Sequence, residues 1–584
     1  MSLCPAAFFF VVALLISCLF LPSIQCRHFL ILSQPFPGHL RPLVELVEEL
    51  SHHVENHNLT LLCIPFSLES DERMKKWYTK RGPINPDDEK VHIAMLDDGK
   101  LRVKNMAEYD EVSQVGNGEI SQAVRHIMLD IMKPFEEYVT SQLEVVEMDE
   151  QNRTFIRNFT SFGANSNSKN GSTHYLRIKN DPKQTLFEHV ILDVALFQSQ
   201  ALDSAHHITC TKIHTFFGDK NPMHHPHILA AGRDNFTSFW KRLWLPVVGF
   251  ELVRLVMDYM PTPKLLPYLE QSKMSCSHLV MSSYAFETIS PSTLQLNTHF
   301  TGPFVNEKNL LSELDQIKKF DQDPTHPLYN ILTWMDQQQS ILLIVLGTTT
   351  KFDHPQLLHF IQAVHTTLVD TNVSIILSLS TTNMQLLDSE MTELLSHPTR
   401  LKLITGFIPQ KAFLRMDKVH IFLTHCGANS VLEGLYEGKA LIGMPYSFDH
   451  FLMSSLIEDA GCGISLFTSQ QGKKQWQVKD LARAVNRILD PDGKYLQRAR
   501  RIRLMMRHGG GVKRAAEIVE WMSDLRGDLE WIKVEDHLTW WQYWCLDIGA
   551  VVVGVVVMVM VVLWMLVGKV CCRVLSKRKL EKEE

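Results

Sequence analysis

Short apolar runs alternate with amphipathic segments along most of this chain. The first run lies within 27–33 and precedes a segment whose apolar residues, from Leu43 to Leu50, recur at helical spacing. Similar strand-like runs lie at 59–65, 186–192, 341–346, 373–379, 401–405 and 419–423, and helical patterns lie at 477–489 and 499–525. Buried strands that alternate with helices predict an α/β fold with parallel sheets.

Two longer apolar segments lie outside this rhythm. Residues 6–22 are uncharged and precede Cys26, a pattern typical of a signal peptide over 1–26, although a basic start is missing. Residues 548–567 also lack charge and are long enough to span a bilayer as a transmembrane helix. Lysines and arginines follow at once, so the positive-inside rule places the tail, 568–584, in the cytosol. The sequence therefore predicts a single-pass type I membrane protein whose lumenal part lies against membrane lipid.

Length and composition favour two globular domains, which we expect at 27–300 and 301–530. The chain has 584 residues, of which 45% are hydrophobic and 21% charged, enough for more than one core. A net charge of -6 gives no basic field for nucleic acid, so we expect no nucleic-acid partner. Residues 149–184 are rich in Asn, Ser and Lys, which predicts an exposed, mobile insertion.

Glycosylation and cysteine patterns bear on the compartment. Six Asn-x-Ser/Thr sequons fit a lumenal location, at Asn58, Asn152, Asn158, Asn170, Asn235 and Asn372. The eleven cysteines are scattered without Cys-x-x-Cys pairs, so their spacing predicts neither a disulfide framework nor a zinc site.

The stretch 407–450 carries the most specific chemistry. A strand-like run at 419–423 leads through Thr-His-Cys-Gly-Ala-Asn-Ser into a helix. A helix that begins directly after a buried strand presents backbone N–H groups and the positive end of its dipole, which suits a phosphate or diphosphate. We expect Asn429 or Ser430 to cap this helix and Glu433 to lie in its first turn, within reach of ribose hydroxyls. An ordinary capped turn is the alternative that these residues alone leave open.

Residues of particular types recur in order through this stretch. They are Phe407, Gln410, His425, Gly427, Asn429, Ser430, Glu433, Pro445 and Asp449. The block closely resembles the nucleotide-sugar motif of the UDP-glycosyltransferases, glycosyltransferase family one. The resemblance implies that Phe407 stacks on uracil, and that Gln410 contacts the base or the ribose. It also implies that Glu433 binds the ribose.

The same resemblance assigns residues to the binding of the diphosphate and of the sugar. His425 and the turn at Asn429 and Ser430 would hold the diphosphate, with close backbone approach at Gly427. Asp449 and His450 would hold sugar hydroxyls. Two positions depart from the family: Phe407 stands where Trp is usual, and His450 where Gln is usual. A histidine at the second position is associated with galactose in related plant enzymes, so glucose, glucuronic acid and galactose all stay open as donor sugars.

The first domain carries the candidate general base. His39 falls after the first strand, in a Pro-x-x-Gly-His-x-x-Pro segment that matches the family's base-bearing segment. Ligands of open α/β sheets bind at the carboxyl ends of strands, where His39 lies. Asp193 ends the run at 186–192 and resembles the family's orienting aspartate; its alternative role is to cap the next helix.

Three further stretches contain residue types that could bind a phosphate or a metal. Gly347 and Thr348 end the strand at 341–346 and suit a second diphosphate contact. The histidines of 222–227 and the aspartates of 321–323 suggest metal sites, but each lies in a proline-bearing loop that is more typical of solvated surface. We therefore expect no metal and no cofactor other than the UDP-sugar co-substrate.

The juxtamembrane segment 536–543 resembles the animal, membrane-anchored branch of the family, which includes UDP-glucuronosyltransferases. This resemblance implies a GT-B fold, with two Rossmann-like domains facing a cleft, and residence in the endoplasmic reticulum. It further implies inverting transfer of a hexose to a small lipophilic acceptor. A GT-B enzyme that lengthens lipid-linked glycans and a catalytically inactive UDP-sugar-binding protein are the rival functions. Homo-oligomer formation is left open.

Overall fold

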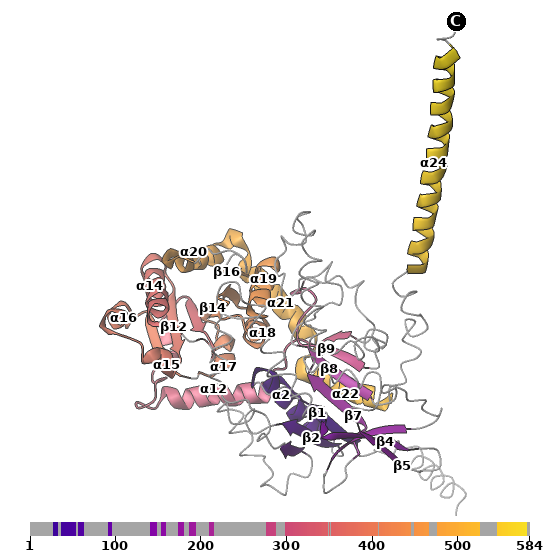
Figure 1. Cartoon of the computed structure of the whole chain (residues 1–584). Helices are drawn as coiled ribbons and strands as arrows, with labels where there is room; N and C mark the ends of the chain where they lie inside the picture. The colour runs from indigo at the N-terminus through magenta and orange to yellow at the C-terminus, as the bar shows by residue number, and fades with distance from the viewer. Residues whose placement is uncertain are drawn as a thin grey trace, which may run out of the picture.

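Two parallel β-sheets, one from each half of the chain, organise the computed structural model (Figure 1). The structure describes residues 27–32, 37–53, 57–63, 91–95, 141–148, 154–158, 173–179, 186–193, 209–214, 276–287, 298–347, 350, 352–406, 408–445, 449–466, 476–525 and 546–580. The predicted signal peptide and the histidine loop at 222–227 lie outside these residues.

The first sheet has seven strands in the order β10-β9-β8-β7-β1-β2-β3. Its strands are β1 (Arg27–Leu32), β2 (His57–Cys63), β3 (Val91–Met95), β7 (His189–Asp193), β8 (Thr209–His214), β9 (Cys276–Val280) and β10 (Thr298–Phe300). Each pairing between these strands is parallel. Chain order reverses between β1 and β7, and such a reversal opens a crevice at the carboxyl ends of the two strands.

The second sheet has six parallel strands in the order β13-β12-β11-β14-β15-β16. They are β11 (Ile341–Val345), β12 (Ser374–Leu379), β13 (Leu401–Thr405), β14 (Val419–Thr424), β15 (Ala440–Gly443) and β16 (Gly463–Ser465). Counted within the domain, this is the Rossmann order 3-2-1-4-5-6, with its reversal between β11 and β14. The strands predicted from sequence in this half are confirmed to within about two residues at each end.

Helices cover both faces of the second sheet. They are α12 (Glu307–Asp321), α13 (Ile331–Asp336), α14 (His354–Asp370), α15 (Thr381–Met384), α16 (Ser389–Leu394), α17 (Gln410–Arg415), α18 (Ala428–Tyr436), α19 (Asp449–Asp459), α20 (Val478–Leu489) and α21 (Tyr495–His508). Along β11, Leu342 and Ile344 join a core with α14 and α20, whereas Ile341 and Leu343 join one with α18 and α21. Burial on both faces explains why these strands are continuous apolar runs.

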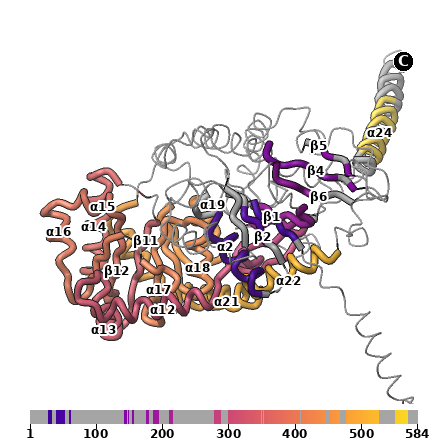
Figure 2. Tube along the Cα trace, turned by 90° about the horizontal axis from the view of Figure 1, so that it is seen from below, coloured from indigo at the N-terminus to yellow at the C-terminus, as the bar shows by residue number. Residues whose placement is uncertain are grey.

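A glycine turn divides the helical pattern predicted at 499–525. α21 ends at His508 and α22 (Gly511–Asp524) begins after Gly509 and Gly510. A Cβ atom on Gly509 would lie 2.6 Å from the carbonyl carbon of Thr301, and the Gly511 N–H donates to the Thr301 oxygen over 2.7 Å. The turn therefore packs directly on the segment that joins the two domains. Helix α22 then returns to the first domain, where it lies beside α2 (Pro37–His53) (Figure 2) and also packs on β8.

The predicted mobile insertion contains ordered strands. β5 (Thr154–Asn158) and β6 (Thr173–Ile178) pair antiparallel with β4 (Leu143–Met148) in a three-stranded sheet. The prediction of an exposed, mobile insertion at 149–184 did not include these strands, although Ile156 of β5 is exposed as expected. Leu176 is fully buried, because residues alternate between the two faces of a strand even in a polar sequence.

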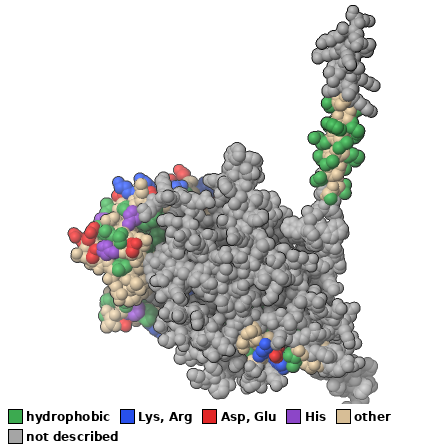
Figure 3. Space-filling view, viewed as in Figure 1, with side chains coloured by type: hydrophobic (Ala, Val, Ile, Leu, Met, Phe, Trp, Pro, Cys, Tyr) green, Lys and Arg blue, Asp and Glu red, His purple; other side chains and the backbone are tan. Residues whose placement is uncertain are grey.

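Helix α24 (Leu546–Leu580) contains the predicted transmembrane segment, 548–567. Hydrophobic side chains cover its described stretch (Figure 3), and Val551 and Trp564 are 67% and 77% exposed. Judged on the described side chains, none of the helices is both long and apolar enough to cross a membrane.

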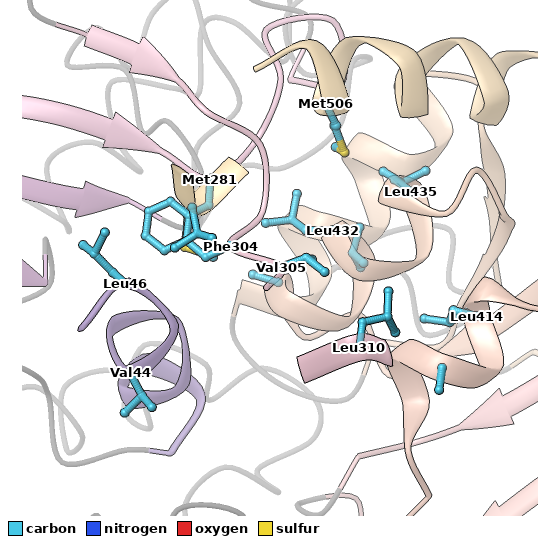
Figure 4. Close-up of a cluster of buried hydrophobic side chains, with 14 of the residues drawn as sticks. Val44, Leu46, Met281, Phe304, Val305, Leu310, Leu414, Leu432, Leu435 and Met506 are labelled. Carbon is cyan, nitrogen blue, oxygen red and sulfur yellow. The ribbon is translucent and has the colours of Figure 1, made fainter. Parts of the chain in front are cut away.

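One apolar core continues from the first domain into the second. Val44 and Leu46 of α2, Phe304 of the joining segment, Leu310 of α12 and Leu432 of α18 belong to it (Figure 4). The two domains thus meet through buried side chains rather than through a solvated hinge alone.

A disulfide in the first sheet was not predicted. Cys210 of β8 is disulfide-bonded, and the strand register places Cys276 of β9 opposite it. Sequence spacing could not reveal this, since it is strand pairing that brings distant cysteines together.

Candidate active site

The candidate donor residues gather where the strand order of the second sheet reverses. Val345 of β11 is in register with Thr424 of β14, so Gly347 and His425 follow the carboxyl ends of neighbouring strands. This is the position at which doubly wound sheets bind nucleotides. The expected diphosphate contact of Gly347 stays a prediction.

The His425 imidazole lies between two glycines. A Cβ atom on Gly347 would lie 2.6 Å from its Cε1 atom, and one on Gly427 would lie 2.6 Å from its Nε2 atom. Gly347 also has a φ of 72°, which side-chain-bearing residues rarely adopt. Both glycines thus leave room for the ring, a supporting role for Gly347 that the sequence did not reveal.

Helix α18 begins at Ala428 with Gly427 as its N-cap, so the expected capping by Asn429 or Ser430 is wrong. Gly427 has no side chain that could accept hydrogen bonds from the first N–H groups of the helix. Cys426, just before it, has a φ of 69°, so the backbone turns sharply between strand and helix. The start of α18 therefore presents N–H groups and a dipole end toward the crevice, as an anion site requires.

A hydrogen-bonded group lies on the first turns of α18. Gln410, the first residue of α17, donates from Nε2 to Oε2 of Glu433 over 2.8 Å and to Oγ of Ser430 over 3.3 Å. Glu433 is the sixth residue of α18 and so lies in its second turn, not in the first as predicted. Residues three positions apart share a helix face, which puts Ser430 beside Glu433. The structure thus brings three of the predicted ribose and diphosphate residues together.

His450 lies against His425. Their ring centroids are 4.8 Å apart with an interplanar angle of 84°. Burial lowers the pKa of His450 to about 4, so its imidazole is neutral at physiological pH. The position associated with sugar recognition is therefore an uncharged hydrogen-bonding group. Asp449 begins α19 beside it.

The candidate base and its partner lie at the reversal point of the first sheet. His39 lies in the first turn of α2, directly after β1, and Asp193 is the last residue of β7. Leu32 and Leu192 are in register, so the two strands end at the same edge, as predicted. Asp193 is buried. A hydrogen bond between His39 and Asp193 stays a prediction.

Other predicted contacts lie outside the described part of the structure. Phe407 and Thr348 are not described, nor are the side chains of His39, Asn58 and Asp449. Their predicted roles stay predictions.

The metal alternative at 321–323 is not supported. Asp321 Oδ1 accepts from the Leu332 N–H over 2.8 Å, and Asp323 Oδ1 accepts from the Thr325 N–H over 2.9 Å. Both carboxylates serve the local backbone after α12. Among the described residues, no three His, Cys, Asp or Glu side chains lie close enough together to bind a metal.

Comparison with known proteins agrees with this geometry. Residues 362–583 match the family model described as UDP-glucoronosyl and UDP-glucosyl transferase. The chain is 31% identical to the UDP-glucuronosyltransferase homologue ugt-46 of Caenorhabditis elegans over 150 residues, 25% of this chain and 27% of that protein. It is 25% identical to nuatigenin 3-beta-glucosyltransferase of Solanum aculeatissimum over 171 residues, 29% of this chain and 32% of that enzyme. These matches span about a third or less of the relatives' lengths.

Solved structures resemble the fold over most of the chain. UGT71G1 of Medicago truncatula, solved with UDP-glucose, aligns with a TM-score of 0.53 at 15% identity and covers 86% of this chain and 98% of that one. Os79 of O. sativa, solved with U2F and trichothecene, aligns with a TM-score of 0.52 at 16% identity and covers 85% of this chain and 99% of that one.

The two parallel sheets with their covering helices define a two-domain α/β fold like that of these solved structures. Residues 362–583 are similar to the UDP-glycosyltransferase family, glycosyltransferase family one, and the matched relatives carry names of that family.

Proposed function

We propose that this protein is an inverting UDP-glycosyltransferase that moves a hexose from a UDP-sugar to a hydroxyl group of a small lipophilic acceptor. One observation carries the proposal: at the strand reversal of the second sheet, His425 lies between Gly347 and Gly427 at the start of α18. Gln410 and Glu433 lie hydrogen-bonded beside it. Together these groups offer N–H donors to a diphosphate and a carboxylate to a ribose.

The proposed reaction is a single displacement. The acceptor oxygen attacks the anomeric carbon as its proton passes to His39, and the bond from that carbon to the diphosphate oxygen breaks. Attack from the face opposite the leaving group inverts configuration. A positioned general base of this kind contributes roughly 10²–10⁴ in rate. Asp193 stabilises the resulting imidazolium, and its place at the end of β7, beside β1, supports this role.

Departing UDP gains negative charge, which the start of α18 and His425 stabilise in this proposal without a metal. The choice among glucose, glucuronic acid and galactose stays open. We assign it to Asp449 and His450, and the contact of His450 with His425 supports that assignment.

We also propose that the catalytic domains lie in the lumen of the endoplasmic reticulum, behind a cleaved signal peptide and anchored through 548–567. The exposed apolar side chains of α24 support the anchor, and the family match includes this helix. The disulfide at Cys210 supports an oxidising compartment. An anchored cleft would meet acceptors dissolved in membrane lipid.

The test is UDP release by microsomes that express the chain, with a panel of UDP-sugars and one promiscuous phenol. We expect release that depends on the acceptor and on one sugar. His39→Ala should lower the rate about 10²-fold or more, because it removes the base. His52→Ala, an exposed histidine of the same helix, is the matched control and should keep full activity.

Other outcomes separate the rival functions. Turnover only with lipid-linked oligosaccharide would favour an enzyme that lengthens glycans. UDP binding without turnover on any sugar or acceptor would favour an inactive binding protein. Full activity of His39→Ala would remove His39 as the base.

A further inference from the structure

The helix of the proposed base contacts the helix of a proposed donor residue across the domain interface. α2 carries His39 in its first turn, and α17 begins with Gln410. Lys411, the next residue, donates from Nζ to Oε1 of Glu45 on α2 over 2.8 Å. This ion pair joins the helix that places His39 to the helix that places Gln410.

A second contact reinforces the first. Asn309 of α12 donates from Nδ2 to Oε2 of Glu45 over 3.0 Å and to Oε2 of Glu48 over 2.7 Å. Glu45 and Glu48 lie three residues apart, on one face of α2. Glu45 therefore accepts one hydrogen bond from each of two helices of the second domain. We call Glu45, Glu48, Asn309 and Lys411 the interdomain latch.

The ion pair of the latch lies mostly out of water. The side chains of Lys411 and Glu45 are each 14% exposed, and the neighbouring residue Val44 is part of the apolar core between the domains (Figure 4). Charges withdrawn from solvent are screened less than surface pairs, and their attraction depends steeply on distance and geometry. Apolar packing tolerates small shifts of one helix along another, whereas this pair favours one separation of α2 and α17.

The latch is also connected to the donor site. Gln410, next to Lys411, donates to Glu433 over 2.8 Å at the proposed ribose position. A run of direct contacts therefore leads from Glu433 through Gln410 and Lys411 to Glu45. UDP bound at Glu433 and Gln410 would order the start of α17, and the ion pair would transmit that order to α2.

We propose that the interdomain latch couples UDP binding in the second domain to the placement of His39 in the first. This inference rests on the proposed function and adds a means by which the base is held ready only when the donor is present. Glu45 and Lys411 act through α2 and are positioning residues. Misplacement of a reacting group by about 1 Å costs on the order of 10²-fold in rate, so breaking the pair should lower kcat about 10- to 100-fold.

Hydrogen exchange of the full chain in detergent tests the coupling without turnover. In the wild type, UDP should slow amide exchange in both α17 and α2. Glu45→Gln should keep the protection of α17 and lose that of α2. Glu144→Gln is the matched control, because Glu144 pairs with Arg177 over 2.7 Å at 18% and 19% exposure but lies within the three-stranded sheet. It should behave as the wild type.

Kinetics supply the second arm. Glu45→Gln and Lys411→Met should lower kcat while the UDP dissociation constant, measured by calorimetry, changes less than about twofold, because neither residue touches UDP in this proposal. Exchanging the charges, with Glu45→Lys and Lys411→Glu together, should recover most of kcat. A single cooperative thermal transition shows in each case that the variant is folded, even where the loss of the pair lowers the melting temperature.

Three results would overturn the latch alone: protection of α17 without α2 in the wild type, equal losses of kcat and UDP affinity in Glu45→Gln, or a folded exchange variant without recovery. Absence of any protection by UDP in α17 would instead overturn the donor site, and the latch with it. The two failures are therefore distinguishable.

Discussion

At the scale of single residues, the environment of His425 and His450 decides the chemistry of the donor site. Gly347 and Gly427 leave the space that the His425 ring fills, and His450 packs edge-on against that ring. Burial lowers the pKa of His450 to about 4, so the site holds a neutral imidazole where the family usually has an amide. Both groups can donate and accept hydrogen bonds without charge.

The burial of His450 predicts a pH-dependent stability. Its folded pKa of about 4 lies below the ordinary value of 6.5, so the unfolded chain binds this proton more tightly. The stability it contributes is complete above pH 6.5 and is lost as pH falls toward 4. Over that window, the wild type should lose on the order of 3 kcal/mol more than His450→Gln, which cannot titrate. Thermal unfolding across this range measures the difference.

The exposed His508 provides the control for this prediction. His508→Gln should follow the wild-type pH dependence, since this substitution lies on the surface and leaves the buried His450 in place. If His450→Gln and the wild type lost the same stability as the pH falls, the inference that His450 is buried in its neutral form would be refuted. The same variant should shift the ratio of donor sugars used, and an unchanged ratio would remove His450 from sugar selection.

At the scale of elements, the turn between α21 and α22 places α21 in the second domain and α22 against the first. The sequence pattern suggested a single helical region at 499–525, but Gly509 and Gly510 end α21 against the joining segment. α22 then packs on α2, the helix that carries His39. The joint between the domains is thus formed in part by close backbone contact, which only a residue without a side chain allows.

Gly509→Ala tests that contact. The new Cβ atom would lie 2.6 Å from the Thr301 backbone, and Gly509 has ordinary helical dihedral angles, so steric overlap is the main cost. Overpacking of this kind costs about 1–3 kcal/mol, and the melting temperature should fall. Gly554→Ala in α24 is the control, because nothing described lies within 4 Å of its Cβ position. Equal melting temperatures for both variants and the wild type would contradict the close approach.

At the scale of the whole molecule, the continuous apolar core makes the two domains one cooperative unit. Leu310 and Leu432 of the second domain belong to the same buried cluster as Val44 and Leu46 of the first (Figure 4). Apolar burial is the main favourable term in such an interface. The interdomain latch lies beside this core, so its charged contacts form on a surface already held together.

Leu310→Ala should weaken the packing between the two domains. Leu→Ala in a core costs about 2–5 kcal/mol, here at the interface, so the single unfolding transition should broaden or split into two. Leu377→Ala, equally buried in the core of the second domain alone, is the matched control. It should lower stability without moving the domains apart. Calorimetry distinguishes the cases, and one sharp transition in Leu310→Ala would contradict a shared core.

The sequence by itself determined the parallel sheets and the ordered block from Gln410 to His450. Strands buried on both faces are continuous apolar runs, and turn residues follow each strand, so β13 and β14 were predicted closely. The strand order adds that Gly347 with His425, and His39 with Asp193, share two reversal points.

Only the tertiary structure decided how these parts meet. Several features depend on partners far away in the sequence. They are the strands within 149–184, the disulfide at Cys210, and the space that Gly347 leaves for the His425 ring. The pairing of Glu45 with Lys411 depends on residues 366 positions apart. Local patterns record which face of an element is buried, because that preference repeats along the chain. Local patterns do not reveal which distant side chain packs against that face. At the candidate site of this protein, contacts between distant residues determine the chemistry.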